Sequence, residues 1–385
     1  MRKLSTSLLT MASIVMLFSS AFSQNMFDTV VNYAVGTAAV SVFSTDFNGD
    51  GNNDLVTTNM VGPTYASILL GNGDGTFQNA VNYAVGNVSV FSIDFNGDEN
   101  NDLVIANYNS DNVSILLGNG DGTFQSAVSY ATGGVNHSVF SIDFDGDGYN
   151  DLVTANHLYG QVSILLGNGN GTFQSAVNYT VGSMPFSVFS IDFNGDENND
   201  LVTANAGTDN VSILLGNGNG TFQSAVNYDA GDEPYSVFSI DFDGDENNDL
   251  VTANKSSDDV SILLGNGDGT FQGAVGYAVG SMPFSVFSID FNNDGNNDLA
   301  TANGSNNVSI LLNLGGPYYI CGDVDGLPRV NILDIVYIIN YKYKSGPAPD
   351  PLEAADVDGS GVVNILDVVY LINFKYKSGP ELVCP

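Results

Sequence analysis

The sequence predicts a mainly β protein in which a six-bladed β-propeller precedes a small α-helical module. Two observations in its 385 residues lead to this fold class. The composition changes after Gly316, where two related acidic stretches each precede an apolar run of helical character. Before that point an acidic pattern, Asp-Phe-Asn/Asp-x-Asp-x-x-Asn-Asp-Leu, recurs at steps of 48 or 49 residues, beginning at Asp46, Asp94, Asp143, Asp192, Asp241 and Asp290.

Each repeat contains four short segments of strand character. In the fourth repeat these are residues 187–193, 201–204, 211–215 and 221–228, and a glycine-asparagine hairpin turn at 216–220 precedes the last of them. A propeller blade is a four-stranded sheet of this length. Helical periodicity is absent before residue 330, which excludes a helical solenoid.

The two ends of the repeat region complement each other. The sixth repeat stops after Leu312, without the glycine turn and the fourth segment. Residues 27–36 resemble 77–86, which form a fourth segment in the first repeat. We therefore predict that the N-terminal strand closes the last blade, which removes the exposed sheet edges that promote aggregation.

The charge of the chain is strongly unbalanced. It has 43 acidic residues against 8 Lys and Arg, a formal net charge of -35, and Lys255 is the one base between residues 4 and 328. Such a surface cannot neutralise phosphates, which excludes nucleic-acid binding, and it disfavours anionic membrane surfaces. Metal ions are the expected countercharge.

The N-terminus predicts export. Residues 1–23 read as a signal peptide, because Arg2 and Lys3 precede an apolar run and a small-residue cleavage site. An uncleaved anchor is the alternative, although the run is too short to span a bilayer. We expect a secreted or cell-surface protein, in which Cys321 and Cys384 form a disulfide or, alternatively, stay free thiols.

The acidic pattern also predicts calcium loops. Counting from the first Asp, side-chain oxygens fall at positions 1, 3, 5 and 9, and position 7 can offer its carbonyl. Calcium takes six to eight oxygen ligands, and carboxylates that converge without a cation repel one another. Plain Asx turns open to water are the alternative. The predicted ligands, for about six ions, are Asp46, Asn48, Asp50, Asn52, Asp54, Asp94, Asn96, Asp98, Asn100, Asp102, Asp143, Asp145, Asp147, Tyr149, Asp151, Asp192, Asn194, Asp196, Asn198, Asp200, Asp241, Asp243, Asp245, Asn247, Asp249, Asp290, Asn292, Asp294, Asn296 and Asp298.

These motifs carry a family resemblance. The acidic loop, the Asp-Leu-Val segment and the turn Leu-Leu-Gly-Asn-Gly-Asp-Gly-Thr-Phe resemble FG-GAP/VCBS-type repeats over residues 24–316. The resemblance implies an integrin α-like propeller whose structural calcium loops link the first two strands of each blade. Glu99, Glu197 and Glu246 stand where other copies have glycine, as at Gly51 and Gly148.

Loops on the opposite face vary among the repeats. They are residues 60–65, 108–112, 157–161, 255–259, 183–185 and 232–234. Such variety over a uniform scaffold fits a recognition surface for a glycan or a surface protein, with His157, Tyr159 and Lys255 as candidates. Drift in unconstrained loops is the alternative. No catalytic residues are predicted, because no Ser-His-Asp set can be assembled by spacing. Paired carboxylates for glycoside hydrolysis are possible in principle, but the metal loops already use most acids of the propeller.

Residues 317–385 form the second module. Asp323 to Asp334 and Asp356 to Asp367 are related stretches 33 residues apart, each followed by an apolar helical run. They resemble the duplicated EF-hand-like calcium loop and helix of a type I dockerin, which docks onto cohesin domains. A self-contained module that folds against itself is the alternative.

The dockerin resemblance implies specific residues and one or two calcium ions. Leu327 and Pro328 depart from the family pattern in the first loop. The implied ligands are Asp323, Asp325, Asn331 and Asp334 in the first loop, and Asp356, Asp358, Ser360, Val362, Asn364 and Asp367 in the second. The implied cohesin-contacting residues are Ile332, Leu333, Ile365 and Leu366.

Two functions follow from these observations. The first is a secreted calcium-binding propeller that acts as a binding or scaffold module and attaches through its dockerin to a cohesin-type partner. The alternative is an extracellular carbohydrate-active enzyme, an O-glycosyl hydrolase of polysaccharide degradation in a cellulosome-like assembly. That alternative rests on the dockerin resemblance alone, because dockerins commonly accompany polysaccharide-degrading modules.

Overall fold

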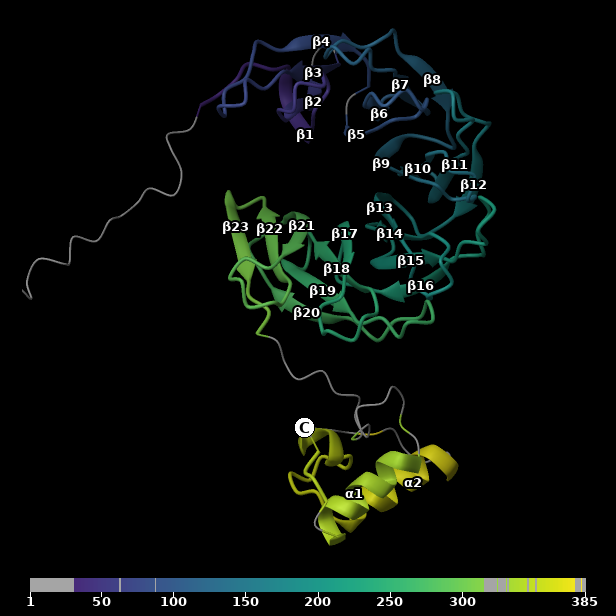
Figure 1. Ribbon diagram of the computed structural model, residues 1–385, viewed down its shortest axis with the longest axis vertical. Helices are drawn as coiled ribbons and strands as arrows, with labels where there is room; N and C mark the ends of the chain where they lie inside the picture. Colours follow the sequence, from purple (N-terminus) through teal and green to yellow (C-terminus); the bar gives the residue numbers. More distant parts are fainter. Residues whose placement is uncertain are drawn as a thin grey trace, which may run out of the picture. The chain divides into compact units, whose positions relative to one another are not determined.

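The structure is a computed structural model that describes residues 31–61, 64–86, 88–314, 324, 330, 332–344, 346–349, 352–377 and 382. Six antiparallel sheets follow one another in chain order and form the blades of a β-propeller (Figure 1). Two helices follow in the C-terminal module. The predicted fold class is therefore confirmed.

The strands of the first three sheets pair in the order in which they occur in the chain. The sheets are β1 (Thr37–Thr45), β2 (Asp54–Val61), β3 (Tyr65–Leu69) and β4 (Val81–Ala84); β5 (Ser89–Ile93), β6 (Asp102–Ala106), β7 (Asn112–Leu116) and β8 (Val128–Ala131); and β9 (Asn136–Ile142), β10 (Asp151–Asn156), β11 (Gln161–Leu165) and β12 (Val177–Thr180).

The last three sheets repeat this pattern, and the sixth has three strands among the described residues. They are β13 (Pro185–Ile191), β14 (Asp200–Asn205), β15 (Asn210–Leu214) and β16 (Val226–Asp229); β17 (Pro234–Ile240), β18 (Asp249–Asn254), β19 (Asp259–Leu263) and β20 (Val275–Ala278); and β21 (Pro283–Ile289), β22 (Asp298–Asn303) and β23 (Asn307–Leu311).

The fourth strand of a blade is shorter than its predicted segment. In the fourth blade, residues 221–225 precede β16 and contribute a single bridge between Gly216 and Phe222. The glycine turn holds this stretch through the amide of Asn217, which donates to the carbonyl of Thr221 at 2.9 Å. The hairpin is therefore present, but its ladder begins further along the chain.

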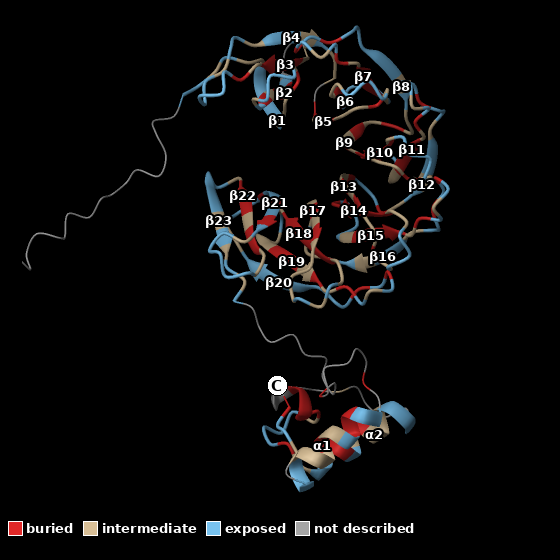
Figure 2. Cartoon of the chain, in the orientation of Figure 1, coloured by how far each residue is buried: buried red, intermediate tan, exposed pale blue. Residues whose placement is uncertain are grey.

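The core lies between successive sheets. Val202 and Val211 of the fourth blade pack with Val237 and Leu250 of the fifth, and these side chains are buried. Both faces of the central strands are covered, so β10, β14 and β18 are buried along their whole length (Figure 2). Each blade thus stabilises the next by burial of apolar surface.

The two end blades leave complementary apolar surfaces uncovered. Val42 in β1 is 63% exposed, whereas Val188 at the same place in β13 is 4% exposed. Val308 in β23 is 64% exposed, whereas Val211 in β15 is fully buried. In every inner blade these two surfaces cover each other between neighbours, and at the ends of the row they face no neighbouring sheet of the described chain.

Several predictions concern residues outside the described part. The signal peptide, Cys321, Cys384, Asp323, Asp325 and Asn331 lie there, and so do residues 27–30 of the predicted closing strand. Residues 31–35 are described without a strand. The closing strand and the disulfide therefore stay predictions.

The C-terminal module has a hydrophobic core of its own. It contains helix α1 (Ile332–Lys344), the short 3-10 helix η1 (Leu352–Ala355) and helix α2 (Ile365–Lys377). Ile338 and Leu371, one from each long helix, are fully buried together in this core. No helix in the described ranges is long and apolar enough to span a membrane.

Deletion of residues 24–36 tests the closing strand. The unpaired edge of β23 and the exposed Val308 and Ile310 need a covering strand, so we expect a lower melting temperature and stronger aggregation than in a chain that lacks residues 1–23 alone. Differential scanning calorimetry measures the change. An equal melting temperature for both chains would show that the closing strand is not needed.

Candidate metal loops and docking helices

The acidic loops link the first two strands of each blade, as the resemblance implied. In the fourth blade the loop Asp192–Asp200 runs from the end of β13 to the start of β14. The carboxylate of Asp192 accepts the amides of Asn194 at 3.0 Å, Gly195 at 2.8 Å and Glu197 at 2.8 Å. The loop therefore closes around its first residue.

The last Asp of each loop is buried and holds two backbone segments together. Asp200 is fully buried, and its Oδ2 accepts the amide of Phe193 at 2.9 Å while its Oδ1 accepts the amide of Gly216 at 2.7 Å. One carboxylate thus joins the acidic loop to the glycine turn of the same blade. The same pair of bonds recurs at Asp54, Asp102, Asp151 and Asp249.

Position 7 directs its side chain to the glycine turn. A Cβ on Gly218, whose φ is +68°, would lie 2.1 Å from Oδ1 of Asn198. Tyr149 occupies the same place in the third blade, against Gly169. Because a Tyr fits there as well as an Asn, the side chain is not required as a ligand, and the carbonyl is the group that position 7 can offer.

Two propeller loops bring three carboxylates together. Asp143, Asp145 and Asp151 have oxygens within 4.8 Å of one another in the third loop, and the fifth loop does the same. Both have Asp at position 3, where the other loops have Asn. In the fourth loop Nδ2 of Asn194 donates to Asp196 at 3.1 Å, which compensates part of the negative charge.

Burial and like charges raise carboxyl pKa values in these loops. Burial, followed by the charge of Asp249, raises the pKa of Asp243 to about 7. Burial also raises the pKa of Asp102, Asp151, Asp200 and Asp249 to about 6, against the opposing effect of their amide hydrogen bonds. A divalent cation would remove this penalty, so the residues fit a metal ion.

A side chain that the sequence reasoning missed connects neighbouring loops. Asn199, at position 8, donates from Nδ2 to the carbonyl of Asp143 in the preceding blade at 2.8 Å. Asn101, Asn150, Asn248 and Asn297 make the equivalent bond. The recurrence of Asn at this position in all six repeats was the available signal. The acidic loops therefore form one hydrogen-bonded series.

The second loop of the C-terminal module gathers its predicted ligands. Asp356, Asp358 and Asp367 have oxygens within 4.8 Å of one another. Asp356 accepts the amides of Ser360 at 3.0 Å and Gly361 at 2.5 Å, and Asp367 accepts the amide of Asn364 at 2.6 Å. Nδ2 of Asn364 donates to the carbonyl of Val362 at 2.8 Å. Burial raises the pKa of Asp367.

Of the first loop's predicted ligands, Asp334 alone is described. Asp334 is buried, and its Oδ1 accepts the amide of Val324 at 2.9 Å. The residue therefore ties the loop to the start of α1, in the manner of Asp367 at the start of α2.

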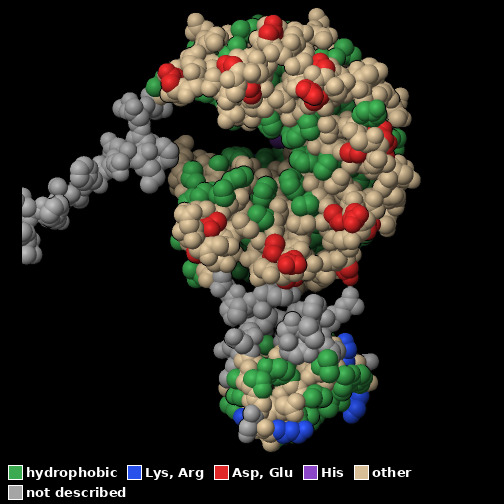
Figure 3. Space-filling view, in the orientation of Figure 1, with side chains coloured by type: hydrophobic (Ala, Val, Ile, Leu, Met, Phe, Trp, Pro, Cys, Tyr) green, Lys and Arg blue, Asp and Glu red, His purple; other side chains and the backbone are tan. Residues whose placement is uncertain are grey.

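The predicted partner-contacting residues are exposed apolar pairs. Ile332 and Leu333 open α1 and are 53% and 52% exposed, and Ile365 and Leu366 open α2 and are 50% and 59% exposed. Figure 3 shows that Lys and Arg side chains gather on this module, while Asp and Glu side chains lie over the propeller. The helix ends carry Lys342, Lys344, Lys375 and Lys377.

The FG-GAP-like repeat family model matches four overlapping stretches, residues 94–154, 143–203, 192–252 and 241–301, which together span more than half of the chain. The chain belongs to the FG-GAP-like repeat family. The type I dockerin model matches residues 321–374. The FG-GAP propeller is thus joined to a dockerin, a module that implies cohesin-mediated assembly and that generally binds calcium.

Solved structures share the fold. No curated protein matches the chain. A putative 6-phosphogluconolactonase from Bacteroides uniformis is 13% identical with a TM-score of 0.52, over 70% of this chain and 79% of that one. A protein of unknown function from Desulfotomaculum acetoxidans is 12% identical with a TM-score of 0.51, over 72% and 86%. At such identities the likeness shows the propeller fold alone.

Replacement of Glu197 by Gly tests the backbone of the acidic loops. Glu197 has a φ of +67°, where Gly148 of the third loop has +85°. This left-handed conformation costs a residue with a Cβ about 1 kcal/mol, so Glu197→Gly should stabilise the calcium-loaded protein by about that amount. Chemical denaturation measures it.

Gly148→Ala is the matched control, because no atom lies within 4 Å of the added Cβ and strain alone acts. It should destabilise the protein by a similar amount. Equal stability of both variants and the parent would contradict the assigned strain.

The raised pKa values predict an unusual pH dependence for the chelated protein. A carboxyl whose pKa is higher in the folded state contributes stability below the unfolded pKa and loses it as pH rises through the folded value. With folded pKa values of about 6 for Asp151 and about 7 for Asp243, the melting temperature in chelator should fall between pH 4.5 and 7.5.

Calcium should reduce or reverse this slope, because it binds the ionised carboxylates. Thermal melts at a series of pH values, with and without calcium, measure both slopes. A melting temperature in chelator that rises over this interval would contradict the assignment.

Proposed function

We propose that this protein is an exported calcium-binding scaffold whose propeller carries a recognition face and whose dockerin attaches it to a cohesin-bearing partner. The observation that carries the proposal is the pair of exposed apolar side chains at the same place on α1 and α2. These four large apolar side chains are at least half exposed on a small module. Exposed apolar patches of this kind are typical of protein–protein interaction sites.

The second acidic loop of the dockerin supports calcium-dependent docking. Asp367 belongs both to the loop and to the first turn of α2, directly after Leu366. The amide of Leu366 donates to Oδ1 of Asn364 at 2.8 Å, so a loop residue also caps the helix. Calcium in the loop would therefore fix the position of Ile365 and Leu366.

Calcium in the propeller would serve stability. The loops fit a cation through their oxygens, their raised carboxyl pKa values and the scarcity of bases, and an ion that binds only the folded state stabilises it. We propose one ion in each of the six acidic loops and one or two in the dockerin, with the residues named from the sequence as ligands.

Export is proposed on the sequence of residues 1–23 together with the dockerin, whose partners would be reached outside the cell. The carbohydrate-active enzyme alternative gains no specific observation. In the part of the chain that the structure describes, the groups of three converging acidic side chains all lie in the acidic loops. We therefore propose no catalytic residues.

Cohesin binding tests the proposal directly. The full mature chain should bind at least one member of a cohesin array in calcium, and chelation should abolish binding. The double variant Leu333→Asp with Leu366→Asp should weaken binding roughly 30-fold or more, because the loss of even one buried apolar anchor at an interface costs about 2 kcal/mol. Surface plasmon resonance measures the affinities.

Tyr343→Asp with Tyr376→Asp is the matched control, since both tyrosines are 57% exposed near the other ends of the two helices. It should leave the affinity unchanged. Absence of binding to every cohesin, or equal weakening by both double variants, would overturn the docking proposal.

A further inference from the structure

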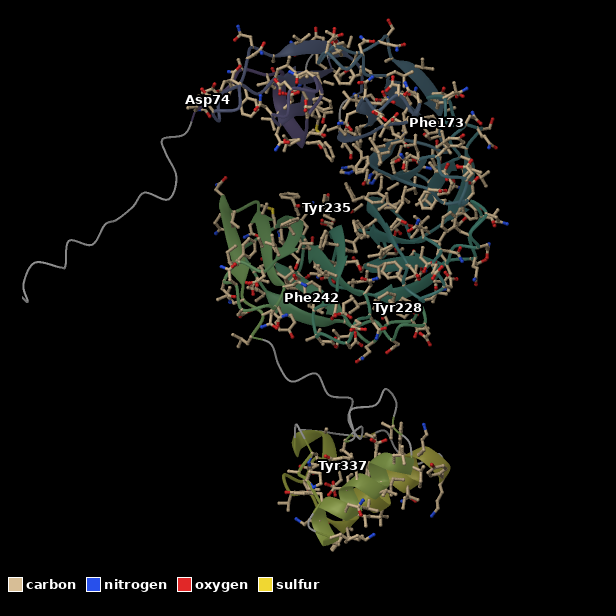
Figure 4. The ribbon with its side chains drawn as sticks, viewed as in Figure 1. Asp74, Phe173, Tyr228, Tyr235, Phe242 and Tyr337 are labelled. Atoms are coloured by element: carbon tan, nitrogen blue, oxygen red, sulfur yellow. The ribbon has the colours of Figure 1, made fainter. Side chains whose placement is uncertain are left out.

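A row of aromatic side chains follows the innermost strands on the face opposite the acidic loops. His137, Phe186, Tyr235 and Phe284 stand at the second position of β9, β13, β17 and β21. Their ring centroids are 4.3 Å apart from His137 to Phe186, 4.0 Å from Phe186 to Tyr235 and 5.6 Å from Tyr235 to Phe284. Figure 4 labels Tyr235 on the inner side of the curved row of sheets.

A β-bulge places each of these rings. The register of β13 with β14 shifts between Pro185 and Ser187, so that Phe186 is the extra residue. The same shift makes Tyr235 and Phe284 the extra residues of β17 and β21. A bulge re-aims a side chain out of the normal alternation of a strand. The four rings with Tyr108 and His157, which contact them from neighbouring loops, are called the bulge cluster below.

A buried polar atom that makes no hydrogen bond to the described residues lies within the bulge cluster. The His157 ring centroid is 4.4 Å from that of Phe186, and the side chain is 8% exposed. Its Nδ1 has no hydrogen-bond partner among the described residues. A buried polar atom without a partner is costly, so a ligand that bonds Nδ1 would be favoured. Burial lowers the pKa of both His137 and His157, which keeps both rings neutral.

Lys255, the single Lys or Arg of residues 4–328, lies at this cluster. Its Nζ is 4.6 Å from the Tyr235 centroid, donates to Oη of Tyr235 at 3.1 Å and pairs with Glu233 at 3.4 Å. The cation of Lys255 already occupies the electron-rich face of Tyr235. A second cation would be repelled there, and an anion would be repelled by the acidic propeller.

The backbone beside the cluster is strained and held in place. Met184, Glu233 and Met282 have φ values of 54°, 52° and 55°, each two residues before a ring of the cluster. The amide of Glu233 donates to Asp209 at 2.9 Å and that of Met282 to Asp258 at 2.8 Å, both in the preceding loop. Strain that the surroundings maintain is typical of ligand sites.

We propose that the bulge cluster binds a neutral oligosaccharide, with sugar rings packed along the row from Tyr108 to Phe284 and hydroxyl groups bonded to His157 Nδ1 and to the Lys255–Glu233 pair. The outer rings are open, since Tyr108 is 37% and Phe284 44% exposed. Aromatic faces bind the C–H faces of sugars. A neutral ligand is repelled neither by Lys255, as a cation would be, nor by the acidic propeller, as an anion would be. This inference specifies the recognition face of the proposed function.

Isothermal titration calorimetry of the full mature chain in calcium tests the inference. The probes are cellohexaose, xylohexaose and mannohexaose, with oligogalacturonate and a lysine-rich peptide as charged comparisons. At least one neutral hexasaccharide should bind, and Phe284→Ala should weaken that binding roughly tenfold. Lys255→Ala, which removes no core contact, should weaken saccharide binding several-fold. This second variant tests the inference if Phe284→Ala does not fold.

Tyr277→Ala is the matched control, because Tyr277 is 48% exposed on the outermost strand β20. It should bind like the parent. Binding of no neutral hexasaccharide, unchanged affinity in both cluster variants, or binding of the peptide alone would overturn the inference. Cohesin binding is measured in the same samples, so that a failure of docking with saccharide binding retained contradicts the docking proposal alone.

Discussion

The buried carboxylate at the end of each acidic loop is the interaction on which the propeller depends. Asp200 and its equivalents connect the strand-linking loop to the glycine turn, and they do so from positions with no exposure to solvent. Burial makes ionisation costly, as the raised pKa of Asp200, about 6, expresses. A bound cation would stabilise the ionised form of such a carboxylate, so the residue that holds the blade together also favours a cation in the loop.

Hydrogen bonds connect the acidic loops of neighbouring blades. From the second loop to the sixth, the Asn at position 8 donates to the carbonyl of the first Asp in the preceding loop, as Asn199 does with Asp143. The amide of Gly220, in the glycine turn of the fourth blade, donates to the carbonyl of Phe144 in the third at 3.0 Å. Order in one loop is thus communicated to the next through backbone contacts.

The sequence predicted what is encoded locally and repeated. The acidic loops and the glycine turns follow from spacing within one repeat, and the structure places them as expected. The two predicted C-terminal helices also form, but they begin at Ile332 and Ile365, so that Asp334 and Asp367 lie in their first turns. The role of Asn199 was missed because its partner lies 56 residues away in another blade. The bulge at Phe186 was missed because it depends on pairing register, which a strand pattern alone does not determine.

Direct measurement of bound calcium tests the central claim, that cations in the acidic loops allow so negative a chain to stay compact. Native mass spectrometry of the mature chain, at increasing free calcium, counts the ions. The account predicts about one ion for each of the six acidic loops besides those of the dockerin, with the narrowest charge-state distribution at full occupancy. A compact propeller that retains no calcium, or ions confined to the dockerin, would contradict it.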